Sequence, residues 1–542
     1  MSVAYSYPGI YIQELPLSTH TITPTPTSIA AFVGYTHPWK TVLFNTAIQL
    51  FSFSDYEANF GGLYTSGLMV SDVARAVYAF FLNGGTNCYV VGLSADATGP
   101  NPGDVWPVGP GPGGLTADYL AYGASIVPDS AAPTVGIQLT AREPADMITM
   151  AASVTNLRAS SSVSGNDTFD LIITYGTRVE VYRSLNLAAA AGTTGSLDQV
   201  INGASALVTV APMSGTSYGA KFTAAPAVQV FKLLVVGTGA APTVTTAYAA
   251  SDFIGQFQAN TSLDNVEIFN ILLVPGSTDN AVLGAALEFA ERKRAFMIVD
   301  APLQATASGN GPQSISTLAA TVPTSQNGAL YFPWLQTTDP VSGMPMAQAP
   351  SGYVAGIYAA TDTARGVWKA PAGLATSLLG TVGPVQTGVM NDMQQGVLNQ
   401  KAINCMRTFS GTGTVVFGAR TLVGADANTA FAQSKYVPVR RMTLFIEQTL
   451  LANLKWAVFE PNDEPLWLAL RSSIEAFLLS LFNQGALQGS TPSSAFQVKC
   501  DSTTTTAADQ QNGIVNIVIG VALLKPAEFV IITISQLAGQ TN

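Results

Sequence analysis

The histidines are the first residues to examine, because few other side chains in this sequence could carry acid–base chemistry. There are only two, His20 and His37, and both lie near the start of the chain. A Ser-His-Asp triad would have to recruit one of them, yet no G-x-S-x-G motif accompanies either. His20 lies in a proline–threonine stretch and His37 follows the first apolar run, which are poor places for a catalytic base. We therefore expect both to be ordinary polar residues.

Carboxylates that lie close together could act as acid and base or bind a metal ion. The densest cluster is in FEPNDEPLW, which contains Glu460, Asp463 and Glu464. The alternative is the acidic start of the following helix, where carboxylates meet free N–H groups and the helix dipole. We favour this alternative. Asp300 ends an expected strand, as carboxylates of α/β enzymes often do, but no base, metal ligand or nucleophile completes a site with it.

Glycine-rich stretches could bind phosphate, but no G-x-x-x-x-G-K-[ST] motif is present. The stretches Gly109–Gly114, Gly237–Pro242 and Ser410–Val416 do not start a convincing helix, so we expect loops. The three cysteines lie far apart without a CxxC motif, which predicts buried thiols in a reducing compartment. The sequence therefore predicts no cofactor, no metal site and no enzyme activity.

Composition points to assembly with other protein. Only 10% of the 542 residues are charged, against about 25% in ordinary domains, so much of the surface is expected to contact protein. The formal net charge is −10 and no cluster of Lys and Arg is present, which argues against nucleic acid as a partner. Lys525, Pro526 and Glu528 interrupt the apolar tract Ile514–Ile534, so we expect two strands and no membrane span. No signal peptide is visible, and a soluble protein that stays inside the cell is expected.

The pattern of elements predicts an α/β fold, α+β overall, with several domains. Residues 95–250 read as short alternating strands between two stretches of β-α-β texture, which indicates a β-rich inserted domain. The predicted regions are 1–27, an N-terminal arm; 28–94, the first part of a core domain; 95–250, the inserted outer domain; 251–390, an α/β domain; and 391–542, a C-terminal domain.

The C-terminal region is expected to hold two amphipathic helices and a hairpin. One helix runs from about Val439 to Trp456, and the other lies between Asp463 and Gly485. The second helix is expected to bury Leu466, Trp467, Leu470, Ile474, Phe477, Leu478 and Leu481 on one face. The hairpin would pair Ile514–Leu523 with Phe529–Ser535 around the sequence KPAE.

A short strand-like run at the N-terminus, Ile10–Leu15, is fenced by Pro8 and Pro16. A strand of this size is not stable alone, so its partner must lie elsewhere in the chain or in another chain. The leash TITPTPTS that follows favours extended geometry. It could act as a hinge while the end strand stays paired.

Several collinear blocks resemble tail sheath proteins of phages with contractile tails and of related contractile injection systems. They include YPGIYIQELPLSTHTITPTPTSIAAFVGYT, AVYAFFLNGGTNCYVV, PSGYVAGIYAATDTARGVWKAPAG, YVPVRRMTLFIEQTL, WAVFEPNDEPLW and FLLSLFNQGALQGSTPSSAFQVKCD. They cover both ends and much of the second half, whereas residues 95–250 match nothing in the family pattern.

The resemblance implies a sheath subunit that forms six-fold rings stacked helically around an inner tube. From a metastable extended state the sheath would contract and drive the tube through a target envelope. It implies baseplate and tail-terminator partners, assembly in the bacterial cytoplasm, and a place in a phage tail or an injection particle. It also implies a subtilisin-like middle region, without a working protease site because both histidines fall outside it.

In the family, the arms leave their own subunit and join a sheet of a neighbour. Carried onto this sequence, the inter-subunit arm residues are Ile10, Tyr11, Ile12, Gln13, Glu14, Leu15, Phe529, Val530, Ile531, Ile532, Thr533 and Ile534. The tube contact implied by the resemblance falls on the Val439–Trp456 helix, with outward Lys435, Arg440, Arg441 and Lys455 as candidates. The alternatives are an α/β hydrolase with an appended β domain and a non-contractile tail or capsid component.

Overall fold

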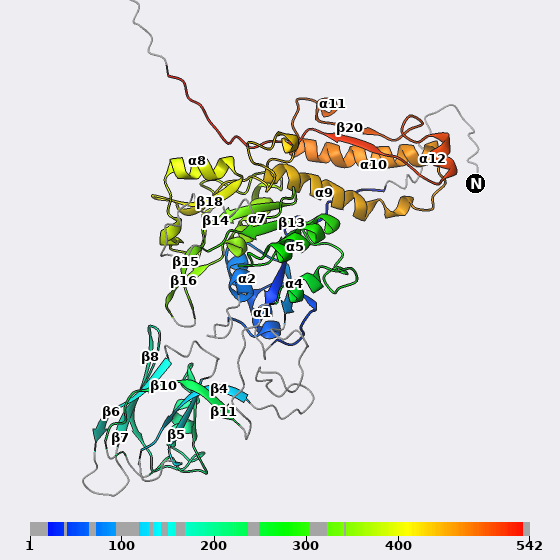
Figure 1. The fold of residues 1–542 in the computed structure, drawn as a ribbon. Helices are drawn as coiled ribbons and strands as arrows, with labels where there is room; N and C mark the ends of the chain where they lie inside the picture. Colours follow the sequence, from blue (N-terminus) through cyan, green and yellow to red (C-terminus); the bar gives the residue numbers. More distant parts are fainter. Residues whose placement is uncertain are drawn as a thin grey trace, which may run out of the picture. The chain divides into compact units, whose positions relative to one another are not determined.

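The computed structural model describes residues 20–36, 41–63, 72–93, 119–128, 134–141, 150–158, 168–219, 222, 224–236, 249–303, 322–340 and 343–534 (Figure 1). The chain divides into two compact units, and each is described by itself. The smaller unit holds residues 1–25 and 445–525, and the larger one holds residues 26–444 and 526–542. The predicted arm strand Ile10–Leu15 and His37 lie outside the described residues.

The larger unit is built on a mixed sheet whose described strands follow the order β19-β18-β14-β13-β12-β1-β3-β2. From β18 to β3 all neighbours are parallel, and the edge strands β19 and β2 are antiparallel. Parallel neighbours need crossover connections, which agrees with the predicted β-α-β units. The strands are β1 (Ala30–Tyr35), β2 (Ala47–Leu50), β3 (Cys88–Leu93), β12 (Ile271–Leu273), β13 (Phe296–Asp300), β14 (Gly328–Phe332), β18 (Ile403–Phe409) and β19 (Gly413–Phe417).

Helices cover both faces of this sheet. Successive residues of a strand point to opposite faces, so neighbouring residues of β1 belong to different cores. Phe32 belongs to a hydrophobic core that α2 and α7 complete, and Val33 belongs to a second core that α4 and α5 complete. Glycine allows α2 and α7 to pack closely, since a Cβ atom on Gly352 would lie 2.4 Å from the carbonyl oxygen of Ala76. The helices are α1 (Phe53–Phe60), α2 (Asp72–Leu82), α4 (Ala250–Gln256), α5 (Asn280–Lys293), α7 (Ser351–Arg365) and α8 (Asp392–Gln400).

A small antiparallel sheet and two short 3-10 helices complete the α/β part of this unit. The sheet contains β15 (Leu335–Thr338), β16 (Pro345–Gln348) and β17 (Gly383–Pro384), and the 3-10 helices are η1 (Gln386–Gly388) and η2 (Thr429–Phe431).

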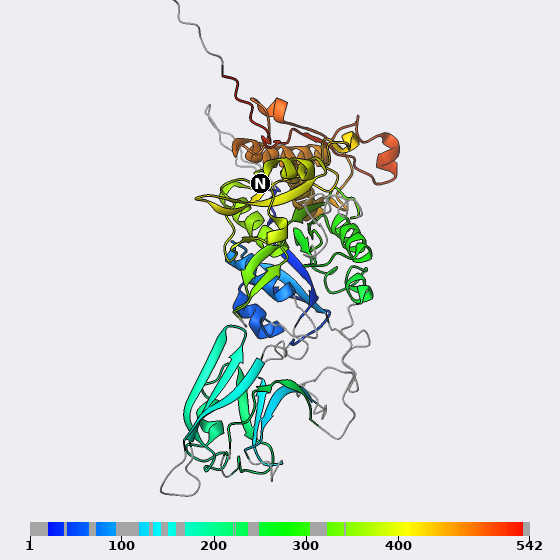
Figure 2. The ribbon, with the colours of Figure 1, turned by 60° about the vertical axis from the view of Figure 1, so that its left-hand side comes forward.

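The β-rich module has a hydrophobic core of its own. Its described strands form two antiparallel sheets, with orders β10-β6-β7-β8 and β11-β4-β5-β9, drawn mainly in cyan and teal in Figure 2. Leu171, Ile173 and Tyr175 of one strand are buried while Ile172 and Thr174 are only partly so, which is the alternation of a sandwich. The elements are β4 (Tyr119–Ile126), β5 (Ile137–Ala141), β6 (Met150–Arg158), β7 (Thr168–Tyr175), β8 (Arg178–Asn186), α3 (Leu197–Ile201), β9 (Val208–Pro212), β10 (Gln229–Val230) and β11 (Lys232–Val236).

The smaller unit is organised around a long amphipathic helix. Asp463 caps this helix, Pro465 stands in its first turn, and the seven residues predicted to face inward are all buried, so the prediction is confirmed. By length and composition α10 could also cross a membrane, but one such helix is weak evidence because core helices pass the same test. The elements are the end of α9 (Val437–Asn453), η3 (Lys455–Ala457), α10 (Glu464–Asn483), α11 (Pro492–Ala495), β20 (Phe496–Lys499), α12 (Ala507–Gln511) and β21 (Val518–Val521).

The predicted C-terminal hairpin is wrong. β21 pairs antiparallel with β20, and the chain from 524 to 534 is extended without a strand assignment. Phe529–Ile532 are four consecutive apolar residues, so as a strand they would need cover on both faces. A hairpin with β21 would not supply that cover, and Glu528 is instead bound by Arg420.

Candidate assembly site

The C-terminal run Phe529–Ile534 carries a row of exposed apolar side chains. Phe529 is 73% exposed, Ile531 88% and Ile534 90%. Val530 and Ile532 are exposed as well, so large side chains from both sides of the extended chain face solvent. An exposed apolar segment of this kind marks a site for another protein chain. We call residues 529–534 the C-terminal arm.

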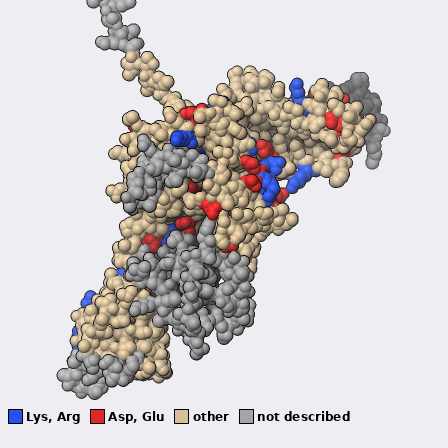
Figure 3. Space-filling view, viewed as in Figure 1, with Lys and Arg blue, Asp and Glu red and all other residues tan. Residues whose placement is uncertain are grey.

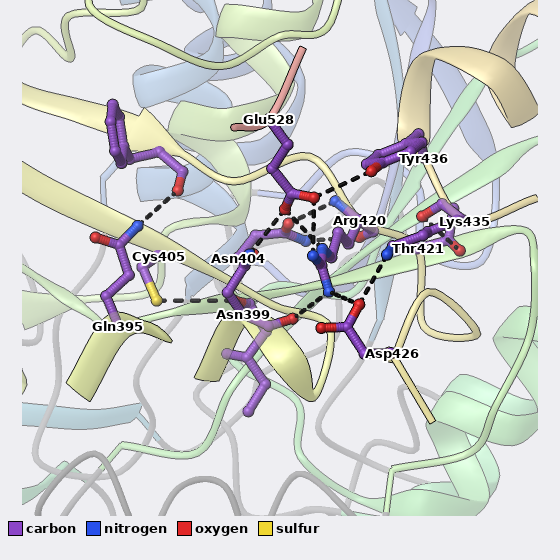
Figure 4. A network of polar contacts seen from close by, with 12 residues as sticks. Gln395, Asn399, Asn404, Cys405, Arg420, Thr421, Asp426, Lys435, Tyr436 and Glu528 are labelled. Carbon is purple, nitrogen blue, oxygen red and sulfur yellow. Dashed lines mark hydrogen bonds and ion pairs between the residues drawn. The ribbon is translucent and has the colours of Figure 1, made fainter. Parts of the chain in front are cut away.

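Glu528 anchors the root of this arm. Arg420 donates from Nε to Glu528 Oε1 at 2.7 Å and from Nη2 to Oε2 at 2.8 Å, which is a two-pronged ion pair (Figure 4). Asn399 Nδ2 donates to Oε1 at 2.8 Å, and the Tyr436 hydroxyl donates to Oε2 at 3.0 Å. Four hydrogen bonds from three side chains therefore fix the residue that precedes the apolar run.

Arg420 is itself held by the surrounding body. The side-chain amide of Asn404 on β18 bonds the backbone of Arg420 in both directions, accepting from its N–H at 2.7 Å and donating to its carbonyl at 2.8 Å. Arg420 Nη1 donates to Asp426 at 2.9 Å, and Lys435 Nζ pairs with the same carboxylate at 2.7 Å. The Arg420 side chain is 1% exposed and is already oriented by these contacts, so it loses little conformational entropy when it binds Glu528.

The charges of the anchor stabilise one another. Burial acts to raise the pKa of Glu528, but the hydrogen bonds from Arg420 and Asn399 and the Arg420 charge outweigh it, so the pKa lies below its ordinary value. Burial acts to lower the pKa of Arg420, and the bonds and charges of Glu528 and Asp426 raise it above its ordinary value. Both groups are therefore ionised at neutral pH.

The two-stranded sheet of β20 and β21 has room for a further strand at its edge. Phe496 pairs with Val521 and Lys499 with Val518, and the described residues add no third strand to this sheet. A two-stranded ribbon is marginal alone, and its edges present unpaired N–H and C=O groups. Val518 is 52% exposed, so apolar surface is available beside one edge.

The outward placement predicted for Arg441 is wrong. Its side chain is 3% exposed and pairs with the 2% exposed Asp362 at 2.7 Å, above the ring of Tyr358. Burial acts to lower the pKa of Arg441, but the charge and hydrogen bond of Asp362 raise it. The signal was in the sequence: Val437, Arg441 and Phe445 share one helical stripe.

The other predicted tube-facing residues are mostly engaged within the larger unit. Arg440 Nε donates to Asn327 Oδ1 at 2.8 Å, and Lys435 is paired with Asp426. Lys455 lies in η3 and is exposed. In the view of Figure 3, Lys and Arg (blue) and Asp and Glu (red) are few on the described surface, and they lie in small groups among the other residues (tan).

The residues that could have carried chemistry have structural roles where the structure describes them. Asp300 Oδ1 accepts from Ser351 N at 2.8 Å, and its Oδ2 accepts from Ser351 Oγ at 2.7 Å and from Gly276 N at 3.0 Å. Burial raises its pKa to about 6, against those hydrogen bonds. Asp463 caps α10, as favoured from the sequence, and Ser410–Val416 forms the turn and strand of the β18–β19 hairpin. Among the described residues, no group of three or more His, Cys, Asp or Glu could hold a metal ion.

Comparison with known proteins gives the class of this chain. Residues 240–422 match the phage tail sheath protein central domain, and residues 429–536 match the phage tail sheath C-terminal domain. Together these two matches cover more than half of the chain, which therefore belongs to the phage tail sheath protein family.

Individual relatives agree with this assignment. A Pseudomonas aeruginosa prophage protein named as a major tail sheath protein is 27% identical over 267 residues, 47% of this chain and 66% of its own length. Among solved structures, the sheath of the PVC extracellular contractile injection system in its contracted state has a TM-score of 0.55 at 21% identity, covering 99% of both chains. The contracted helical sheath of the anti-feeding prophage has a TM-score of 0.54 at 22% identity, covering 98% of this chain and all of its own. These two likenesses show a shared fold.

Proposed function

We propose that this chain is the subunit of a contractile sheath, which polymerises as six-fold rings stacked around an inner tube and contracts to drive the tube through a target envelope. The observation that carries the proposal is the anchored C-terminal arm, whose apolar residues are exposed within one subunit. Family membership and the charge-poor surface support it.

The arm would act by β-augmentation. Six residues at ~3.3 Å each span about 20 Å, which is long enough to add a strand along β20–β21 of a neighbour. Backbone hydrogen bonds would then supply affinity and the apolar side chains would be covered on both faces. The N-terminal strand Ile10–Leu15 would join a neighbour's sheet in the same way.

The remaining features of the proposal concern partners and chemistry. Baseplate and tail-terminator proteins would bind the ends of the sheath, after assembly in the bacterial cytoplasm into a phage tail or injection particle. Of the tube-facing candidates, we propose Lys455, which is exposed, as the contact with an acidic patch of the tube. The middle region would be subtilisin-like in fold without catalysis, since the one described histidine, His20, stacks on Trp456 and belongs to the other unit.

Electron microscopy of the chain co-expressed with its tube protein tests the proposal. We expect hollow tubes with a central channel, found in two states that differ in length and diameter. A protein that stays monomeric, or that forms tubes of a single fixed length per ring, would overturn the contractile function. A variant that lacks residues 529–542 should remain folded and should not form tubes.

A further inference from the structure

The N-terminal leash lies against α9 in the smaller unit, instead of being a free tether. Asn453 Oδ1 accepts from Thr23 N at 3.0 Å, and Asn453 Nδ2 donates to Thr23 O at 2.8 Å. One side-chain amide thus bonds both polar groups of a backbone residue, as a neighbouring strand would. Recognition of this kind depends on backbone geometry, which the proline-rich leash keeps extended.

Two more contacts continue along the same helix. The hydroxyl oxygens of Thr25 and Thr449 lie 2.9 Å apart, and the backbone N–H of Thr25 also donates to Thr449 Oγ1 at 3.3 Å. Thr449 and Asn453 are spaced i, i+4, so they share one stripe of α9. Beyond the end of α9, His20 stacks on Trp456 of η3, with ring centroids 3.8 Å apart and planes 11° from parallel.

Two residues at these contacts are buried, so the leash is packed against the folded subunit. Ile22, between His20 and Thr23, is only 6% exposed, and Thr449 is fully buried. In the larger unit, Arg441 Nη2 donates to the carbonyl of Thr27 at 2.9 Å, so the leash is also held where it enters the body.

We propose that Thr449 and Asn453 of α9 and Trp456 of η3 form a clip that holds residues 20–25 on their own subunit in both the extended and the contracted sheath. Residues 20–25 of the leash then do not swing, contrary to the sequence-based hypothesis. This proposal rests on the proposed sheath function, and it names the residues that position the N-terminal arm of the sheath subunit.

A disulfide between the two threonine positions tests whether the clip stays closed. The hydroxyl oxygens of Thr25 and Thr449 are in contact, so the double variant T25C/T449C is expected to form a disulfide under mild oxidation. The native cysteines Cys88, Cys405 and Cys500 are free and buried, which limits competing reactions. Oxidised and dithiothreitol-reduced samples of this variant are matched, and T25C and T449C alone serve as further controls.

We expect oxidised subunits to assemble, and oxidised sheaths to contract, to the same extent as reduced ones. Sheaths that contract only after reduction would show that the leash must detach, which overturns the clip. Assembly of reduced but not oxidised subunits would overturn it as well, and so would failure of the disulfide to form in the isolated protein. If neither sample nor the unmodified chain gives contractile tubes, the sheath function itself fails, which is a separate result.

A second pair of variants checks that the clip positions the arm. N453A should leave the melting temperature of the subunit nearly unchanged, because Asn453 and Thr23 are at the surface. It should speed thermolysin cleavage before Ile22 several-fold and broaden the distribution of sheath lengths. S472A, at an exposed position of α10, is the control. Cleavage and sheath lengths equal to those of the control would contradict the positioning role.

Discussion

Arg420 and Glu528 stand 108 residues apart in sequence and share two hydrogen bonds, at 2.7 and 2.8 Å. The pair joins the strand region of the larger unit to the last described residues of the chain. The described residues beyond Glu528, 529–534, are all exposed, whereas Arg420 is buried, so this contact marks the boundary between the folded body and the arm.

We predict that E528Q loosens the root of the arm. The amide keeps the shape but loses the charge that Arg420 meets. Arg420 keeps its ion pair with Asp426, so we expect the cost of weakened hydrogen bonds to a charged group, about 1.5–3 kcal/mol. Chymotryptic cleavage after Phe529 should accelerate and unfolding in urea should occur earlier. E460Q, at an exposed position, is the control.

The pH dependence of this effect has a defined sign. The pKa of Glu528 is lowered in the folded state, so its contribution is present above the ordinary glutamate range and is lost as the pH falls through the folded value. The difference in stability between E528Q and the native chain should therefore be largest at neutral pH and shrink in acid. A difference that grows in acid would contradict the ion-pair account.

We predict that I532D blocks assembly without destabilising the subunit. Ile532 is 79% exposed, so an aspartate there should change the free energy of unfolding by less than about 0.5 kcal/mol. Within a shared sheet the same charge would be buried without a partner. Sedimentation and electron microscopy should show monomers. M393D, at a position 84% exposed on α8, should still assemble; equal assembly by both variants would argue against the arm.

Asp72 should make the subunit less stable as the pH rises. Burial raises its pKa to about 7, helped by the nearby charge of Asp300 and opposed by Arg75. A carboxyl group with a raised pKa in the folded state stabilises the fold below its unfolded value, and this stability is lost as the pH rises through about 7.

D72N should remove this dependence. Because water screens the partly exposed Asp72, we expect the variant to gain about 1–2 kcal/mol over the native chain at pH 8 and little at pH 4. Urea denaturation at a series of pH values measures it, with E57Q on the exposed side of α1 as the control. A gain that is the same at both pH values would show that titration of Asp72 is not the cause.

The buried pair of Arg441 and Asp362 should behave differently from a surface ion pair. R441M leaves the Asp362 carboxylate buried without a partner, which costs about 3–5 kcal/mol. The double variant R441M/D362L replaces both charges and should recover much of the loss. Thermal unfolding of R441M, D362L and the double variant measures the coupling, and a loss in the double variant equal to the sum of the two single losses would show that the charges act independently.

Sequence periodicity was sufficient to predict those features that depend on residues within one helix or one β-α-β unit. The buried face of α10, its cap at Asp463 and the β-α-β units follow from spacings within a single helix or crossover, so they could be predicted. The exposed run Phe529–Ile534 could also be found, because an unbroken apolar segment demands a partner wherever it lies.

Contacts between distant segments could not be predicted in this way. Local patterns allow β21 to pair with either neighbour in sequence, and only the tertiary structure selects β20. The same holds for the partner of Arg441: helical spacing places Arg441 on the inward stripe, but only the tertiary structure supplies Asp362. It also holds for the leash, whose backbone hydrogen bonds to α9 no local pattern predicts. The sequence by itself determined which segments need partners, since hydrophobic pattern and backbone restrictions are local. The tertiary structure decided which partner each segment has, because that choice depends on the geometry of residues that are distant in the sequence.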